Sequence, residues 1–229
     1  MAQQRFRVRF RKAERVRYIS HLDVLRSWER SIRRAGLPLT YSQGFTPHPK
    51  IAFASPLPLG FVGEAEIMDV TLDDRVAPSD FEQRLAAQTT DDLALLSAVE
   101  VPAGGPPPQA VLQWSEYEVD VAGVGDEQVQ GAVETFLARD SFEWTEERND
   151  KTRTYDLRAG VATLSARPFG EGVHLWMRLQ SDQQMTTRPE QVVAALLPGA
   201  VAGVYRRTGL VLEDASPARE AWRRVGQFQ

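Results

Sequence analysis

The chain begins with a strict alternation of arginine and apolar residues that predicts a half-buried β-strand. Successive side chains of a strand point to opposite sides, so Phe6, Val8 and Phe10 would share the face toward a core. The opposite, outer face would be cationic, because it carries Arg5, Arg7, Arg9 and Arg11.

An amphipathic helix is predicted after this strand. Ser20 can cap its N-terminus together with Asp23, and Gly36 and Pro38 supply the usual stop signals. At helical spacing, one side of the helix carries the apolar residues Leu22, Leu25, Trp28, Ile32 and Ala35. The opposite side carries Arg26, Arg30, Arg33 and Arg34.

Further periodic segments complete a β-α-β-β-α-β order within residues 1–101. They are strands at 37–42, 51–55 and 65–72, a helix at 79–88 that Ser79 would cap, and a strand at 93–101. The segment 102–111 is too rich in proline and glycine to continue any element, so we interpret it as a linker.

A similar order returns after the linker. Its opening strand alternates apolar Tyr117, Val119 and Val121 with carboxylates instead of arginines. The later elements are a helix at 126–138, strands at 142–145, 152–158 and 173–179, a helix at 188–197, a closing strand or hairpin at 201–212 and a tail with a short helix from Ser216. The repeated layout predicts an α+β protein with two tandem ferredoxin-like (split βαβ) domains, at 1–101 and 112–229.

The composition excludes several kinds of chemistry. The 229 residues include no cysteine and three histidines, so neither disulfides, thiolate zinc sites nor an iron–sulfur cluster can be built from this chain. We therefore expect no metal or cofactor here, and any radical chemistry must belong to another polypeptide. No apolar run suits a membrane span and no signal peptide is evident, so we expect a cytoplasmic protein without a membrane partner.

Charge is distributed unevenly along the chain, although the formal net charge is only −4. Residues 1–61 contain 12 of the 27 lysines and arginines but 3 of the 31 acidic residues, which gives this segment a formal charge of +9 and the rest −13. Such a basic domain predicts a polyanionic partner, such as RNA. The alternative is that the basic face docks on the acidic half, within or between chains.

The segment 41–60 contains four prolines and no acidic residue. Proline fixes φ, so this loop should be stiff before anything binds, and it could present Phe45 for stacking and Lys50 for a phosphate. The alternative is an Ω-type loop packed on its own domain by Phe45, Phe53, Leu57 and Leu59. The two interpretations are compatible, and we expect a packed loop with a binding rim.

The histidines do not establish a catalytic site. His21 falls toward the apolar side of the helix, which favours a half-buried histidine bonded to the adjacent loop over a catalyst. His48 stands between two prolines and is expected to be exposed. If RNA were cleaved here, His21 and His48 would flank the phosphate and Lys50 would meet the developing charge.

The N-terminal motifs resemble those of a bacterial radical-SAM-linked domain family of unknown function. The resemblance covers roughly residues 5–75 and lies in the segments 17–23, 33–38, 42–50 and 56–60. Its motif positions include Ser20, His21, Asp23, Ser42, Gly44, Phe45, Pro47 and Pro49. The resemblance implies a separate radical SAM enzyme as partner and an RNA- or ribosome-directed role. The tandem layout also looks like the Cas6-type RNA-processing fold, without its glycine-rich C-terminal loop.

Three hypotheses follow from the sequence. The first is a non-catalytic subunit that holds tRNA or rRNA for a radical SAM enzyme, with contacts from Arg5, Arg7, Arg9, Arg26, Arg30, Arg33, Phe45 and Lys50. The second is a metal-independent endonuclease that uses His21, His48 and Lys50. The third is a protein-interaction module that docks the radical SAM partner through the loop 41–60.

Overall fold

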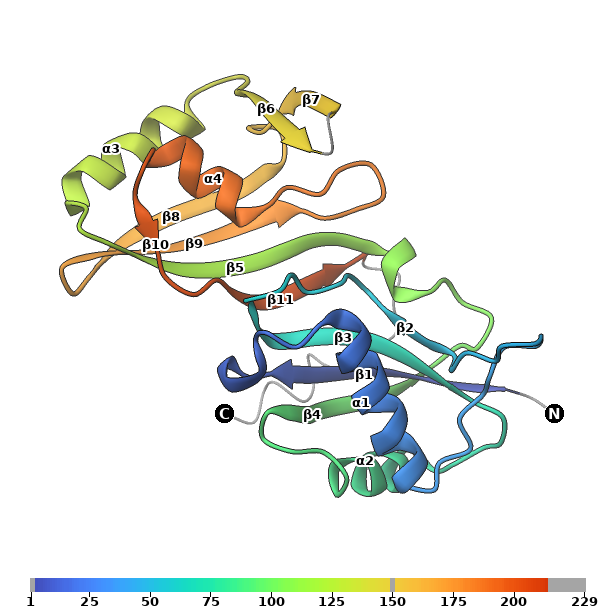
Figure 1. The fold of residues 1–229 in the computed structure, drawn as a ribbon. Coiled ribbons are helices and arrows are strands. Elements are labelled where there is room, and N and C mark those ends of the chain that lie inside the picture. Colours follow the sequence, from blue (N-terminus) through green and yellow to red (C-terminus); the bar gives the residue numbers. More distant parts are fainter. Residues whose placement is uncertain (1–2, 149–150, 214–229) are drawn as a thin grey trace. The chain divides into compact units, whose positions relative to one another are not determined.

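The computed structural model describes residues 3–148 and 151–213 (Figure 1). The tail from residue 214, with the short helix predicted from Ser216, lies outside the described residues. The chain divides into two compact units, one formed by residues 1–112 with the segment from Gly209 onward and the other by residues 113–208. None of the described helices is long and apolar enough to cross a membrane.

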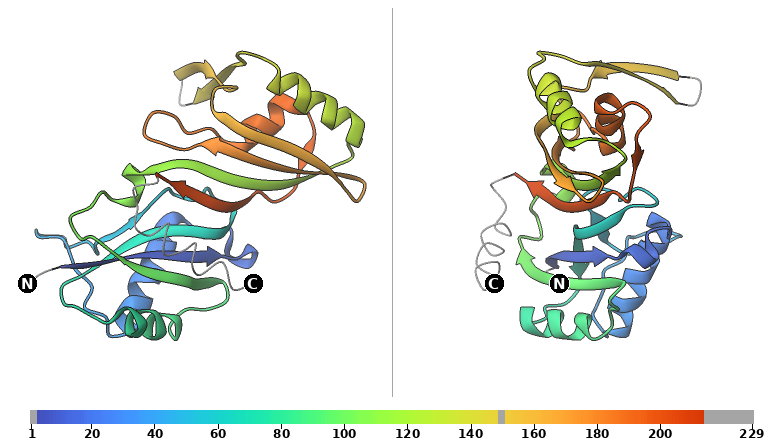
Figure 2. Two further views of the ribbon diagram at one scale, coloured as in Figure 1. Left: turned by 180° about the vertical axis from the view of Figure 1, so that it is seen from behind. Right: turned by 90° about the vertical axis from the view of Figure 1, so that its left-hand side faces the viewer.

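The first unit is an antiparallel sheet with two helices packed on one face (Figure 1 and Figure 2). Its elements are β1 (Gln4–Lys12), the 3₁₀ helix η1 (Glu14–Val16), α1 (His21–Arg34), β2 (Ile51–Phe53), β3 (Val62–Leu72), α2 (Pro78–Ala86), β4 (Leu93–Val101) and the 3₁₀ helix η2 (Pro108–Ala110). The strand order is β4-β1-β3-β2, which is the order of a split βαβ fold.

The core of this unit confirms the apolar face that the alternation predicts for β1. Phe6, Val8 and Phe10 are buried beneath both helices. Phe6 stacks on Phe81 of α2 with ring centroids 4.0 Å apart, and Phe10 meets Trp28 of α1 edge-on at 5.1 Å. Aromatic contacts from one strand thus fix both helices on the sheet.

The second unit repeats the layout with one insertion. Its elements are β5 (Leu112–Ala122), α3 (Asp126–Leu137), β6 (Glu143–Arg148), β7 (Lys151–Asp156), β8 (Val161–Phe169), β9 (Gly172–Gln180), α4 (Pro189–Leu196) and β10 (Val201–Ala202). The main sheet runs β10-β5-β9-β8, whereas β6 and β7 form a separate two-stranded sheet. The predicted α+β class is therefore confirmed, and both units share one strand order.

Three local predictions were wrong. The segment 161–169 was not predicted as a strand, yet it forms β8 at the edge of its sheet, where Pro168 is tolerated because an edge strand need not donate every N–H. The predicted strand at 37–42 has only isolated bridges at Leu39 and Tyr41. Helix α2 begins at Pro78 without a side-chain cap, rather than after a capping Ser79.

The end of the described chain also differs from the predicted domain boundary. Strand β11 (Arg206–Leu212) is divided between the units, and its residues from Gly209 group with the first. Leu212, with half-buried Leu210 beside it, packs in a small core with Ala54, Ile67 and Leu112. Apolar contact with the first unit therefore outweighs sequence position in deciding where this segment belongs.

The prediction of a solvent-facing cationic side on β1 was wrong for Arg5, Arg7 and Arg9. Arg5 and Arg7 are buried, with 8% and 2% of their surface exposed, and Arg9 is half-buried. The Arg7 guanidinium makes two hydrogen bonds to Asp69, its register partner on β3, at 2.7 Å (Nε to Oδ1) and 3.0 Å (Nη2 to Oδ2). A carboxylate in the neighbouring strand therefore neutralises this face internally.

The predicted linker completes the cover of this face. Arg5 donates hydrogen bonds to the carbonyl oxygens of Pro102 (2.6 Å) and Gly105 (3.0 Å). A β-carbon at residue 105 would sit 3.0 Å from the Arg5 guanidinium, so glycine keeps this approach open. Burial lowers the pKa of Arg5, and the charge of Asp69 opposes this shift. The segment that follows β4 is consequently a structural part of the first unit.

Removing the Asp69 carboxylate should strongly destabilise the first unit. In Asp69→Ala the buried Arg7 loses its counter-charge, and we expect the free energy of unfolding to fall by about 3–5 kcal/mol. The matched control is Glu100→Ala, which removes the exposed pair between Glu100 and Arg75 and should change stability by less than about 1 kcal/mol. Urea unfolding followed by circular dichroism measures both, and similar losses in the two variants would contradict the structural role of Asp69.

Candidate nucleic-acid interface

Helix α1 carries four exposed arginines, and local chemistry defines its ends. The Ser20 side chain accepts a hydrogen bond from the Asp23 backbone N–H at 3.2 Å and donates one to the Asp23 carboxylate at 2.7 Å. That hydrogen bond from Ser20 is the main reason why the pKa of Asp23 lies below its usual range. After Arg34 the chain turns at Gly36, whose φ of 63° favours glycine. The predicted cap and stop are both confirmed.

The buried side of α1 leaves its arginines on the surface. Val24, Trp28, Ser31 and Ile32 are buried, so the helix can turn only its opposite side toward solvent. We call the exposed residues on this side the arginine ridge; they are Arg26, Arg30, Arg33 and Arg34.

The ridge is only weakly neutralised. Arg26 lies 3.6 Å from Asp23, an exposed pair of adjacent turns. Arg30 and Arg34 donate to neutral oxygens, those of Ser27 and of Ser31 and Gln88 respectively. Within residues 3–148 and 151–213, no ion pair with a carboxylate involves Arg30, Arg33 or Arg34. Their charges therefore remain available to an anionic partner.

The loop after α1 projects from the unit. Its base is closed by the Ser42 N–H to the His48 carbonyl at 2.8 Å and by the His48 N–H to the Ser42 hydroxyl at 2.9 Å. Between them Phe45 is fully exposed, and the predicted packing of Phe45 and Leu59 on their own domain is therefore wrong. Phe53, by contrast, packs against the core as predicted. The short internal closure of the loop holds the Phe45 ring away from the core.

A side-chain hydrogen bond joins the loop to α1. The Tyr41 hydroxyl donates to the Glu29 carboxylate at 2.8 Å. Burial and this carboxylate together raise the pKa of Tyr41, so the hydroxyl keeps its proton and remains a donor. At the other end of the loop, Lys50 is held by backbone bonds to Thr40 and Thr71 while its side chain is exposed. The start of the loop is thus tied to α1 through Glu29.

The motif before α1 is organised by a buried lysine. The Lys12 ammonium, 2% exposed as a residue, donates to the carbonyl oxygens of Arg17 (2.9 Å) and Ile19 (3.2 Å). The Gly60 N–H donates to the same Arg17 carbonyl at 2.9 Å. These bonds fix the approach to α1, so this part of the motif has a structural role.

His21 is exposed, not half-buried as predicted. Its ring meets Phe53 edge-on, with centroids 4.7 Å apart. The hollow that it borders has a volume of about 10 Å³, which is close to the minimum for one water molecule and far too small for a nucleotide. His48 is exposed in the loop and is held there through its backbone.

The structure therefore separates the predicted contact residues into two groups. Arg26, Arg30 and Arg33 share one exposed helix side, and Phe45 and Lys50 lie on the loop that Tyr41 connects to it. Arg5 and Arg7 are removed from any surface role, and Arg9 is half-buried on the same strand. Arg34 was not selected from the sequence as a contact residue, although its position on the arginine side of the helix was evident.

Comparison with solved structures finds distant similarity to several chains. A chain of a Cbf5-Nop10-Gar1 complex is 13% identical, with a TM-score of 0.49, and the match covers 90% of this chain and 48% of that one. A chain of the archaeal box H/ACA sRNP Nop10-Cbf5 complex is also 13% identical, with a TM-score of 0.46 and coverages of 89% and 47%. This chain thus spans about half the length of these two chains. An unknown protein from Galdieria sulphuraria is 15% identical, with a TM-score of 0.28 and coverages of 91% and 100%.

The sequence itself matches a family model but no curated protein. No curated protein matches this chain. One family model matches residues 5–189, well over half of the sequence. The protein therefore belongs to the family described as an uncharacterized protein conserved in bacteria, DUF2344.

Proposed function

We propose that this protein is a non-catalytic RNA-binding subunit that holds tRNA or rRNA for a separate radical SAM enzyme. The observation that carries the RNA proposal is the arginine ridge, where Arg30, Arg33 and Arg34 are exposed and make no ion pair with a carboxylate of the described chain. Buried arginines on β1 serve the fold, whereas the ridge has no comparable internal partner.

The spacing of the ridge suits a phosphate backbone. Arg26, Arg30 and Arg33 follow one another at four and three residues, so they form a row along the helix of about 10 Å at 1.5 Å per residue. Guanidinium groups bind phosphate oxygens in a bidentate manner. An exposed aromatic ring on an adjoining stiff loop, Phe45, adds a surface on which a base can stack.

A separate enzyme is proposed because this chain lacks the groups for radical chemistry. It has no cysteine to hold an iron–sulfur cluster, and the motif resemblance described above points to a radical SAM partner. Exposed apolar side chains favour protein docking as a second function of the same unit. Tyr18 and Leu59 are 68% and 64% exposed, and the Tyr18 ring lies beside Gly60, the residue after Leu59.

The RNA proposal predicts a steep salt dependence of binding. We expect the affinity for a structured tRNA to fall as salt rises, with Arg30→Gln and Arg33→Gln each flattening the log–log slope by about 0.7–0.9. Arg75→Gln is the matched control, because Arg75 is an exposed arginine that already pairs with Glu100. Fluorescence anisotropy across a salt series measures the slopes. Binding that is absent, insensitive to salt or equally reduced by Arg75→Gln would overturn the proposal.

The endonuclease alternative makes a different prediction. If the protein only binds RNA, labelled tRNA incubated with it in a chelator remains intact on a denaturing gel. Metal-independent cleavage that disappears in His21→Ala, with the tRNA affinity unchanged, would replace the binding subunit with a nuclease. His48→Ala and Lys50→Ala extend the test to the other two residues of the hypothetical catalytic set.

Docking of the radical SAM partner can be separated from RNA binding. We expect a radical SAM enzyme to co-purify with the tagged full chain after nuclease treatment, and Tyr18→Ser with Leu59→Ser to reduce its recovery while leaving tRNA affinity unchanged. Phe169→Ser is the control, since Phe169 is an exposed apolar residue of the second unit. Loss of the enzyme on nuclease treatment, or equal loss in Phe169→Ser, would contradict direct docking at Tyr18 and Leu59.

A further inference from the structure

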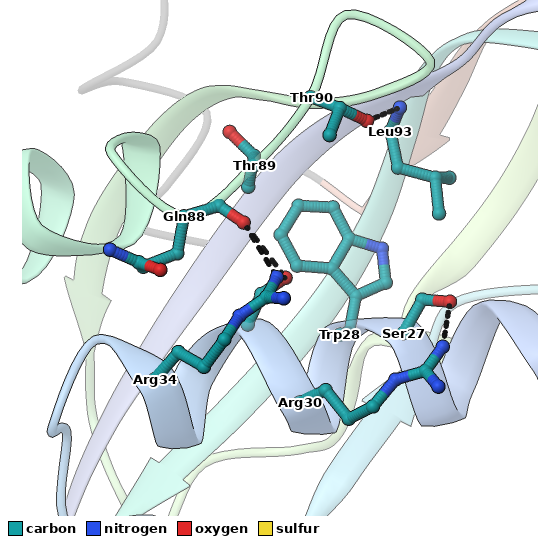
Figure 3. A pocket seen from close by; sticks show the side chains of 9 residues that line it. Ser27, Trp28, Arg30, Arg34, Gln88, Thr89, Thr90 and Leu93 are labelled. Carbon is teal, nitrogen blue, oxygen red and sulfur yellow. Dashed lines mark hydrogen bonds between the residues drawn. The ribbon is translucent and has the colours of Figure 1, made fainter.

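A hollow of about 260 Å³ lies in the first unit between α1 and the segment from Gln88 to Leu93 (Figure 3). Arg30 and Arg34 border it from the helix, and Thr89 and Thr90 border it from the opposite segment. None of its nine lining side chains is acidic. The two charged side chains that line the hollow are therefore both cationic.

Neutral oxygens hold the two arginines of the pocket in place. Arg30 Nη2 donates to the Ser27 hydroxyl at 3.2 Å. Arg34 Nη2 donates to the Gln88 carbonyl at 3.2 Å and to the Ser31 hydroxyl at 3.3 Å. Each guanidinium has five N–H donors, so these bonds position the groups without using all their donors or neutralising their charge. Figure 3 shows the Arg34 guanidinium reaching from α1 toward Gln88, whereas the Arg30 guanidinium lies beside Ser27 of the same helix.

Trp28 belongs both to the pocket lining and to the core of the unit. Its indole lines the pocket and is 1% exposed, and the Nε1 atom has no hydrogen-bond partner in the described residues. In Figure 3 the ring lies between the helix and the segment Gln88–Leu93. A buried donor without an acceptor is uncommon in folded proteins. Because the Nε1 atom is itself buried, a ligand in the open part of the pocket would lie near the indole without bonding to it, and Trp28 serves as a nearby reporter of binding.

We infer that this pocket binds the phosphate group of a nucleotide. Two guanidinium groups and the hydroxyls of Ser27 and Thr90 are donors suited to phosphate oxygens. The volume is below the roughly 300–1,000 Å³ typical of pockets for whole drug-sized ligands, but it accommodates a phosphate with its adjoining sugar. Where the phosphate belongs to RNA, the inference rests on the function proposed above. A phosphate bound in the pocket would then fix the position of the RNA strand along α1.

Titration of the full chain with ribose 5-phosphate tests the pocket. The indole N–H signal of Trp28, assigned in a ¹H–¹⁵N NMR spectrum with Trp28→Phe, should shift saturably with ribose 5-phosphate at constant ionic strength and not with ribose. Arg30→Gln should weaken this binding about tenfold or more, because it removes a charged donor. Arg33→Gln is the matched control, since Arg33 is an exposed arginine of the same helix that does not line the pocket.

The same spectra show whether each variant is folded. Arg34→Gln removes the other arginine that lines the pocket and should also weaken binding. A Trp28 signal that does not saturate, or equal weakening by Arg30→Gln and Arg33→Gln, overturns the pocket. Saturable binding of ribose 5-phosphate without any affinity for tRNA supports the pocket and rejects the RNA function. Binding of tRNA with no response to ribose 5-phosphate keeps the RNA function and rejects the pocket.

Discussion

The buried pair of Arg7 and Asp69 is the constraint on which the first unit depends. The two residues face each other across β1 and β3, each side chain 3% exposed, with Nε–H···Oδ1 and Nη2–H···Oδ2 bonds in parallel. A one-residue slip between the strands would separate the charges inside the protein and turn Phe6 and Val8 away from the helices. The pair therefore links strand register, the core beneath α1 and the position of α1 itself. Because α1 is held in place, the arginine ridge has a fixed position on the first unit.

The arginines of the N-terminal third perform two different tasks, and burial distinguishes them. Arg5, Arg7 and Arg9 of β1 lie on a sheet face that is covered by the chain after β4 and by the small core around Ile67 and Leu212. Charged groups taken out of water need partners, and Asp69 with the linker carbonyls supplies them. The arginines of α1 lie opposite Val24, Trp28 and Ile32, so packing the helix on the sheet leaves them in solvent. The formal charge of +9 over residues 1–61 consequently overstates the charge that a polyanion can reach.

Local patterns were reliable where local chemistry decides the structure. The Ser20 cap, the end of α1 near Gly36 and the apolar face of β1 are all short-range features, and each is confirmed. Features that depend on distant partners were not predictable. His21 was expected on the half-buried side of the helix, but the helix is oriented so that its first turn is exposed. Strand β8 was missed because an edge strand buries few residues and so has little periodicity.

The candidate site shows the same difference between short-range features and features that depend on distant partners. The sequence by itself determined that α1 has an arginine side, that the loop after it is rich in proline and free of carboxylates, and that this chain offers no cysteine for an iron–sulfur cluster. Only the tertiary structure decided which arginines remain accessible, because Asp69 is 62 residues from Arg7 along the chain and meets it only through strand pairing. The pocket between Arg30, Arg34 and the segment at 88–93 also exists only in the folded chain. Helix propensity and capping act over a few neighbouring residues, whereas neutralisation and pocket formation require groups that folding brings together.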